Sequence, residues 1–429
     1  MFERGFCLVM RAWSGLLHHF RLRVTSAGRL AIAGLVAGAV LGLDTRRNLA
    51  SAVFCFVLAL LPFALLGLRF RPRVRGRREL PRFGTVGEPL PYRLLLSNED
   101  EQVLSGLRVS EIFDDPRPDI ARFMAARRTG EGLGWRWDRL VRAARKAQGK
   151  EMSLPVLGHG ENFTLKMELL PLNRGRLHLG SLLLARSETL GLLNGLCELA
   201  CADSVLILPR RYRLPMFSLP GHQSRLQGSW ALPSSVAEAE EFQALRDYRP
   251  GDPLRLIHWK SWARSGKPVI REYQDESAVR HALVLDTFGP SGPAFEEAVS
   301  LAASFACTVE TREALLDLLF VGGEVHRETV GRGHGPVERL LEVLADVSPC
   351  EDKPFRLLHE AVLAHGAELS GCLCVLLGWD EAREAFVRAL AARGLPHEVF
   401  VIGGKVPAPK LPGLHWLEPG KIEEGLATR

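Results

Sequence analysis

Ionisable and aromatic side chains gather between residues 241 and 273, around a Pro-Gly turn at positions 250 and 251. The residues of interest there are Phe242, Arg246, Tyr248, Gly251, Asp252, Arg255, His258, Trp259, Lys260 and Arg264. Aspartate and histidine side chains can act as general acids and bases. However, no serine or cysteine nucleophile accompanies them at a recognisable spacing, and no glycine-rich loop suited to a phosphate lies in this stretch. The sequence therefore predicts a chain that is not an enzyme, with a catalytic role for Asp252 and His258 as the alternative.

A helix is expected to position these side chains, and its start is indicated by Asp252 and Pro253. An aspartate at the N-cap accepts a hydrogen bond from a free backbone N–H, and proline fits the first helical position. The helix would carry Leu254, Ile257, Ser261 and Trp262 on one face and end near Gly266. Residues 267–273 are expected to form a strand that enters the next unit.

Arginine, tyrosine and tryptophan are the side chains that interaction hot spots favour, and all three are dense in this stretch. Two interpretations stay open. The stretch is either a polar and aromatic joint between two neighbouring domains or a surface that binds a partner. In the mixed form that we expect, Trp259 packs as a structural residue while the arginines are partly exposed.

The same stretch resembles the signature of a bacterial family, domain of unknown function 58. The matching positions are Phe242, Leu245, Arg246, Tyr248, Gly251, Asp252, Arg255, Ile257, His258, Trp259, Lys260, Ala263, Arg264 and Gly266. The resemblance implies a C-terminal domain like that of von Willebrand factor A. It also implies a partner, a MoxR-type AAA+ ATPase, and a role as an interaction or scaffold protein in the assembly or maturation of other complexes.

The charge of the 429-residue chain is unevenly distributed. The whole chain carries +6, whereas its first 80 residues contain thirteen arginines, no lysine and three acidic residues, a net charge of +10. The remainder is therefore net negative. Because nucleic-acid surfaces of soluble domains are basic, we expect no nucleic-acid partner.

Two apolar stretches, residues 24–43 and 49–68, flank a short linker at residues 44–48. Each approaches the roughly 20 residues that cross a bilayer. Arginines lie on both outer flanks, which the positive-inside rule places in the cytoplasm. The sequence predicts a transmembrane helical hairpin within residues 1–80, a lipid bilayer as a partner, and an inner-membrane location with both termini cytoplasmic. The alternative is a buried helical hairpin.

The remaining chain divides into three predicted regions. Residues 81–215 show short apolar strands between turn signals, typical of a β-sandwich, with an insertion near 120–150 that is either a solvated surface segment or a binding loop. Residues 216–279 form the signature linker. From 280 to 429 strands alternate with helices, as in a doubly wound parallel sheet. The predicted fold class is thus a transmembrane hairpin, a β-sandwich and a von Willebrand factor A-like α/β domain.

Asp286 follows the first apolar strand of the C-terminal region, where a von Willebrand factor A metal site begins. Such a site needs hydroxyl side chains two and four residues later, because Mg²⁺ prefers hard oxygen ligands. Those positions hold Phe288 and Pro290, so we expect weak or no Mg²⁺ binding and no cofactor. The alternative function is a metal-dependent hydrolase that uses Asp286 and Asp380.

Overall fold

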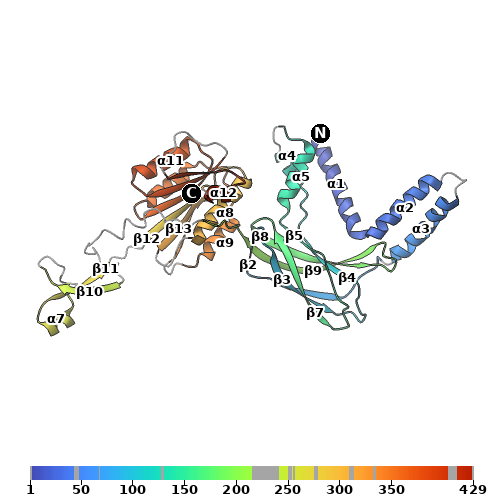
Figure 1. The fold of residues 1–429 in the computed structure, drawn as a ribbon, viewed down its shortest axis with the longest axis horizontal. Coiled ribbons are helices and arrows are strands. Elements are labelled where there is room, and N and C mark those ends of the chain that lie inside the picture. The colour runs from blue at the N-terminus through green and yellow to red at the C-terminus, as the bar shows by residue number, and fades with distance from the viewer. Residues whose placement is uncertain are drawn as a thin grey trace. The chain divides into compact units, whose positions relative to one another are not determined.

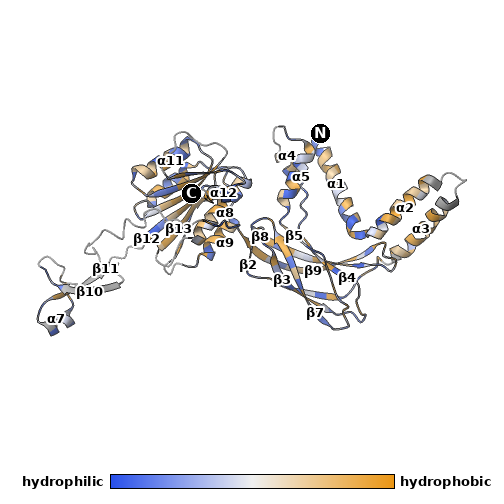
Figure 2. Cartoon of the chain, in the orientation of Figure 1, coloured by the Kyte–Doolittle hydropathy of each residue, from blue (hydrophilic) through white to orange (hydrophobic). Residues whose placement is uncertain are grey.

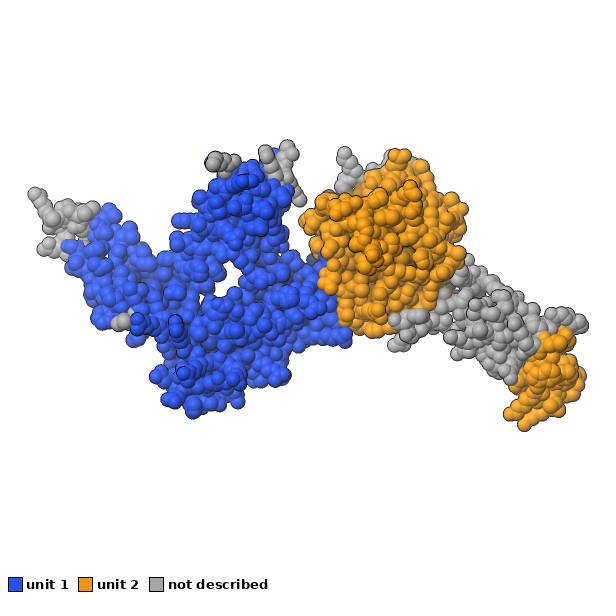
Figure 3. All heavy atoms as spheres, turned by 180° about the vertical axis from the view of Figure 1, so that it is seen from behind, with its two compact units in different colours: residues 1–210 blue, residues 211–429 orange. Residues whose placement is uncertain are grey.

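The structure is a computed structural model of the 429-residue chain. It describes residues 2–42, 48–66, 68–126, 130–214, 241–249, 254, 257–274, 279–308, 314–331, 335–403 and 413–427. The chain forms two compact units, Met1–Arg210 and Arg211–Arg429 (Figure 3). The predicted boundary between residues 215 and 216 lies outside the described residues.

Three helices open the first unit: α1 (Phe2–Arg23), α2 (Ser26–Gly42) and α3 (Asn48–Leu66) (Figure 1). The break between α1 and α2 is fixed by Thr25. Its hydroxyl accepts a hydrogen bond from the backbone N–H of Gly28 at 3.0 Å, and its own backbone N–H donates to the carbonyl of Leu192 at 3.1 Å. A threonine that caps the free N–H groups of a first turn favours a helix start there. The start of α2 is thus held by a turn of the following sheet domain.

The predicted transmembrane segments correspond to α2 and α3, and this prediction is wrong. Among the residues that the structure describes, no helix has both the length and the apolar character needed to cross a membrane. Helix α2 has 17 residues and α3 has 19, which correspond to about 26 Å and about 28.5 Å at a rise of about 1.5 Å per residue. The hydrocarbon core of a bilayer is about 30 Å thick. The predicted inner-membrane location with both termini cytoplasmic is overturned by the same finding.

Two sheets then pack face to face over one core. The first has the order β1 (Val74–Glu79), β3 (Leu90–Asn98), β7 (Asn162–Pro171) and β5 (Ala147–Gly149). The second has the order β2 (Phe83–Thr85), β9 (Asn194–Leu208), β8 (Gly175–Ser187), β4 (Leu107–Ile112) and β6 (Met152–Ser153). Side chains along β3 alternate between buried and less buried positions, and Figure 2 shows the matching alternation of colour along the strands. Such alternation is what a sheet with one face on the core requires.

The segment between β4 and β5 forms two short helices, α4 (Ile120–Ala125) and α5 (Leu133–Ala144). They pack against α1 through a small apolar cluster of Cys7, Phe123, Trp137 and Leu140. The arginine-rich insertion predicted near residues 120–150 is therefore a packed part of the first unit, and its structural role is to support α1.

The first described elements of the second unit form a small antiparallel hairpin, β10 (Glu241–Asp247) and β11 (Val269–Gln274), with helix α7 (Trp259–Ser265) in its connection. We call the described residues between 241 and 274 the signature module. A buried pair, Ile257 and Ile270, forms its core, and Tyr248 and Trp262 pack partly buried against that pair.

The rest of the second unit is a six-stranded sheet with helices between its strands. The sheet order is β14 (Val325–Val330), β13 (Ala314–Val321), β12 (Val279–Leu285), β15 (Gly371–Leu377), β16 (His397–Ile402) and β17 (Leu414–Leu417). Only the pairing of β13 with β14 is antiparallel among the strand pairs described in this sheet. All eight residues of β13 are buried, as expected of a parallel strand covered on both faces.

After the signature helix α7, five helices accompany this sheet in the described part of the unit: α8 (Pro293–Thr308), α9 (Glu338–Asp346), α10 (Arg356–His365), α11 (Glu381–Ala392) and α12 (Ile422–Ala427). On one face, Leu358 of α10 and Phe386 of α11 join a core cluster with Val284 of β12. On the other face, Phe305 of α8 packs against Phe400 of β16, with ring centroids 4.7 Å apart. The strand order reverses beside β12, so β12 and β15 define the switch point where ligands of doubly wound sheets usually bind.

Candidate functional site

The signature module holds most of the described site residues that the sequence predicts. Phe242 and Arg246 lie on β10, while Gly251, Asp252 and Arg255 lie outside the described residues. Helix α7 begins at Trp259, with His258 at the N-cap position, so this helix starts later than the predicted start at Asp252. Its predicted end is confirmed.

That end is set by Gly266, which has a φ of 69°. This left-handed conformation suits glycine because a Cβ atom would be strained there. The backbone N–H of Gly266 donates to the carbonyl of Trp262 at 2.9 Å and closes the last turn. At the other end, the N–H of His258 donates to the carbonyl of Val269 at 2.8 Å. Helix α7 is therefore tied to strand β11 at its start.

The two tryptophans of α7 have different environments. Trp262 is half-buried against Ile257 and Ile270, whereas Trp259 is 64% exposed. The two indole rings are stacked, with centroids 5.2 Å apart and an interplanar angle of 21°. The packing role that the sequence assigned to Trp259 thus belongs to Trp262, and Trp259 is held at the surface.

Helix α7 also carries exposed basic side chains. Lys260 and Arg264 are exposed and four residues apart on α7, a spacing that places them on the same face of a helix. The imidazole of His258 is 2.7 Å from the hydroxyl of Ser261. The described part of the module therefore presents an aromatic ring and two cations to solvent.

A second group of predicted residues meets at the carboxyl end of β12. Asp286 is fully buried directly after that strand. One of its carboxylate oxygens accepts from the backbone N–H of Phe288 at 2.9 Å. The other accepts from the N–H of Leu377 at 2.9 Å and from Nε of Arg383 at 2.6 Å. Asp286 therefore links the ends of the two central strands, β12 and β15.

Arg383 also binds the second predicted carboxylate. Its Nη1 lies 2.5 Å from Asp380, and its Nη2 donates to the carbonyl of Phe288 at 2.9 Å. Its guanidinium carbon lies 4.9 Å from the centre of the Phe355 ring, a favourable cation–π distance. Asp380 in turn caps α11 by accepting from the backbone N–H of Arg383 at 2.9 Å. One guanidinium thus joins both carboxylates.

Asp286 and Arg383 shift each other's pKa. Burial raises the pKa of Asp286, and the charge of Arg383 with the two backbone N–H donors works against that rise. For Arg383, burial works to lower the pKa, but the carboxylates of Asp286 and Asp380 outweigh it and raise the pKa. The guanidinium is therefore charged at neutral pH.

These residues do not fit a divalent metal ion. A cation between Asp286 and Asp380 would lie against the guanidinium of Arg383, and two like charges at such a distance repel. Phe288 and Pro290 bring no side-chain oxygen. Within the described residues, no group of three or more His, Cys, Asp and Glu side chains is arranged to hold a metal. The sequence signal that could have revealed this is an arginine three residues after Asp380, in the first turn of α11.

Comparison with known proteins places a family match on this part of the chain. Residues 244–392 match the family described as Protein of unknown function DUF58. The matched segment starts within β10 and runs to the end of α11, so it contains most of the signature module and the Asp286–Arg383 pair.

A curated relative is similar to part of the chain. The chain is 27% identical over 194 residues to the Uncharacterized protein YeaD of Bacillus subtilis (strain 168), which covers 44% of this chain and 47% of the relative. The chain therefore spans about half the length of the curated relative it matches.

Solved structures show much weaker likeness. The CARDB domain of a Pyrococcus furiosus protein is 11% identical and covers 32% of this chain and 89% of its own, with a TM-score of 0.17. A cohesin module from Clostridium perfringens is 11% identical and covers 32% of this chain and 98% of its own, with a TM-score of 0.15. Scores this low carry no argument about the fold.

Proposed function

We propose that this chain is a protein-interaction protein and that its signature module binds a partner through Trp259. The observation that supports the proposal is the 64% exposure of Trp259, whose ring is already stacked on Trp262. An aromatic side chain that is ordered before binding loses little further conformational freedom when a partner covers it. Tryptophan is also among the residues that most often dominate binding energy at interfaces.

The partner that we propose is a MoxR-type AAA+ ATPase, with which the chain acts in the assembly or maturation of other complexes. This choice rests on the resemblance of residues 242–266 to the family signature and on the family match over residues 244–392. The exposed cations Lys260 and Arg264 favour an acidic surface on that partner, because complementary charges guide the encounter of two proteins.

The hydrolase alternative has no comparable support. It requires Asp286 and Asp380 to hold a metal ion, and both carboxylates are bonded to Arg383. The Asp286 carboxylate is also fully buried, so it is not accessible to a substrate.

A binding experiment with the full chain and a purified MoxR-type ATPase tests the proposal. Trp259→Ala should weaken binding about 30-fold or more, which corresponds to the roughly 2 kcal/mol that defines a hot spot. Trp135→Ala is the matched control, because Trp135 is 73% exposed but lies outside the matched segment. Equal affinity of the two variants would exclude the signature module as the contact. Failure of the unaltered chain to bind would exclude this partner.

A further inference from the structure

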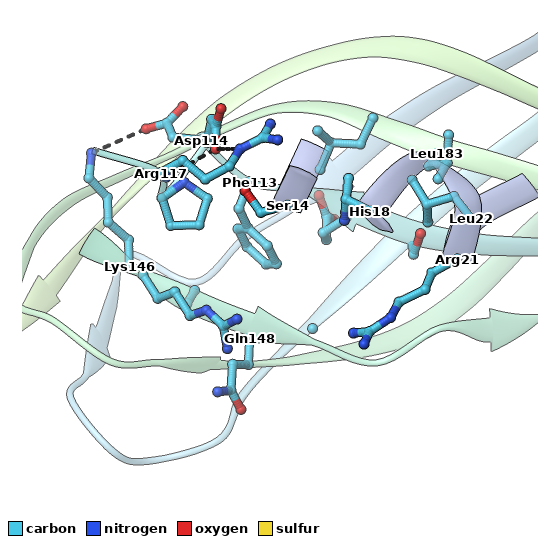
Figure 4. Close-up of a pocket in the computed structure, with 18 of the residues that line it drawn as sticks. Ser14, His18, Arg21, Leu22, Phe113, Asp114, Arg117, Lys146, Gln148 and Leu183 are labelled. Atoms are coloured by element: carbon cyan, nitrogen blue, oxygen red, sulfur yellow. Dashed lines mark hydrogen bonds and ion pairs between the residues drawn. The ribbon is translucent and has the colours of Figure 1, made fainter. Parts of the chain in front are cut away.

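The first unit contains a cavity of about 1010 Å³ that the proposed function does not use. Its walls come from the second half of α1, from β4 and the segment that follows it, from the end of α5 with β5, and from β8 and β9 (Figure 4). Small-molecule sites usually have volumes of about 300–1,000 Å³, so this cavity is at the upper end of that range.

Apolar side chains line the interior of the cavity. Leu17 and Leu22 come from α1, Phe113 directly follows β4, and Leu183 and Leu196 come from the sheet. Leu183 pairs across strands with Ser110 and Glu198, whereas its sequence neighbours Leu182 and Leu184 belong to the buried core. Because side chains alternate across a strand, Leu183 lies on the outer face of the sheet. A leucine there has no role in the sandwich core, but it provides apolar surface for a ligand.

Cationic side chains surround this apolar surface. Arg21 and Arg23 come from α1, Arg117 follows β4, and Arg145 and Lys146 follow α5. Figure 4 shows Lys146 and Arg21 at opposite ends of the labelled group, with Phe113 between them. Basic side chains therefore lie at both ends of the labelled group, and Phe113 provides apolar surface between them.

The acidic residues of the lining leave part of this positive charge uncompensated. Asp115 lies 2.6 Å from Arg117, and Asp114 lies 3.3 Å from Lys146. Glu111 is buried and bonded to Arg78, which faces the core of the sandwich.

Among the residues that line the cavity, one further acidic side chain remains, Glu198. Its single negative charge is outnumbered by the positive charges of Arg21, Arg23 and Arg145. The pKa of His18 in the same lining is lowered, first by burial and then by the nearby Arg117, which agrees with a positive local potential.

We propose that this cavity binds a single anionic amphiphile, a molecule with one alkyl chain and a phosphate headgroup. The alkyl chain lies on the leucines and Phe113, and the headgroup is bound by Arg145, which is next to Lys146 in the sequence. Guanidinium groups suit this role because they donate paired hydrogen bonds to phosphate oxygens. The insertion near residues 120–150 contributes Arg145, so in this proposal it acts as a binding segment as well as a support for α1.

Calorimetric titrations of the full chain below the micellar concentration test the proposal with three probes. Dodecyl phosphate should bind, inorganic phosphate should bind at least tenfold more weakly, and dodecyltrimethylammonium should also bind at least tenfold more weakly. Equal affinities for dodecyl phosphate and inorganic phosphate would show that the alkyl chain does not bind to the cavity. Equal affinity for the cationic amphiphile would show that the headgroup is not recognised, and no binding of dodecyl phosphate would reject the site altogether.

Two variants locate the site. Arg145→Glu should lower the affinity for dodecyl phosphate at least tenfold. Arg142→Glu should not, because Arg142 is exposed three residues earlier and does not line the cavity. Leu183→Asp should also lower the affinity for dodecyl phosphate, while the thermal unfolding temperature of the chain stays unchanged. Identical affinities of the Arg145 and Arg142 variants would place the anion elsewhere.

Discussion

Two regions of the matched segment differ in the solvent exposure of their charged and aromatic side chains. At the carboxyl end of β12, Asp286 is fully buried, and its carboxylate accepts hydrogen bonds from Arg383 and from two backbone N–H groups. In the signature module, Trp259 is ordered by stacking yet 64% exposed. The first region resembles a reaction centre in its residue types but is closed by an internal counter-charge. The second region has few groups suited to catalysis but an exposed aromatic side chain, which is why binding is the function that we propose.

The largest expected effect on the free energy of unfolding is that of a substitution at Arg383. Arg383→Ala should lower the free energy of unfolding by about 3–5 kcal/mol, because removal of one partner leaves the buried Asp286 charge uncompensated. Chemical denaturation of the full chain measures this, with Arg388→Ala as the control on the same helix. Arg388 forms an exposed pair with Glu384, and such pairs contribute about 1 kcal/mol or less. Equal losses in the two variants would contradict a special role for Arg383.

The cost of Arg383→Ala should depend on pH. Arg383 is the charge that works against the raised pKa of Asp286, so its removal should raise that pKa further. An acid whose folded-state pKa exceeds its ordinary value of 3.8 binds more protons when folded, and the folded state is then favoured as the pH falls. We expect the difference between the variant and the unaltered chain to shrink when the pH is lowered from 7 towards the pKa of Asp286. A difference that is constant over this range would show that Asp286 does not carry the cost.

The signature module should behave differently. Trp259→Ala should change the free energy of unfolding by no more than about 0.5 kcal/mol, as exposed substitutions usually do, although it should abolish most of the partner affinity. Parallel denaturation and binding measurements check this separation. A large loss of stability would mean that the exposed ring supports the fold, as the sequence had led us to expect.

The smallest expected effect concerns magnesium. Because Arg383 is bonded to both Asp286 and Asp380, adding Mg²⁺ to the unaltered chain should leave its thermal unfolding temperature unchanged. A titration followed by differential scanning fluorimetry measures the shift, with Asp286→Asn as the comparison. A shift in the unaltered chain that Asp286→Asn removes would show that the ion displaces Arg383.

Local patterns were the more reliable guide to this chain. The alternation of strands and helices that the sequence predicts from residue 280 onwards is found, and the buried strand β15 is part of it. The helix end at Gly266 follows from the left-handed conformation that glycine allows. These features depend on neighbours in the sequence, so a pattern of residues can determine them.

Features that depend on distant contacts were not predictable in this way. Asp286 and Arg383 are 97 residues apart, and their pairing arises only because β12 and β15 are neighbours in the sheet. The difference between Trp259 and Trp262 depends on which ring meets Ile270 of β11. The transmembrane prediction failed for another reason: apolar composition indicated a span but did not show where α2 ends. The alternative of a buried hairpin is not found either, since Leu30 and Phe63 are 75% and 66% exposed.

The guanidinium of Arg383 differs from a bound ion in one further respect. A metal ion occupies its site according to its concentration in the surrounding medium, so a chelator or a change in the cell's magnesium level can empty the site. Arg383 is part of the chain and its local concentration is fixed. The carboxyl ends of β12 and β15 around Asp286 should therefore keep one conformation when the magnesium concentration changes.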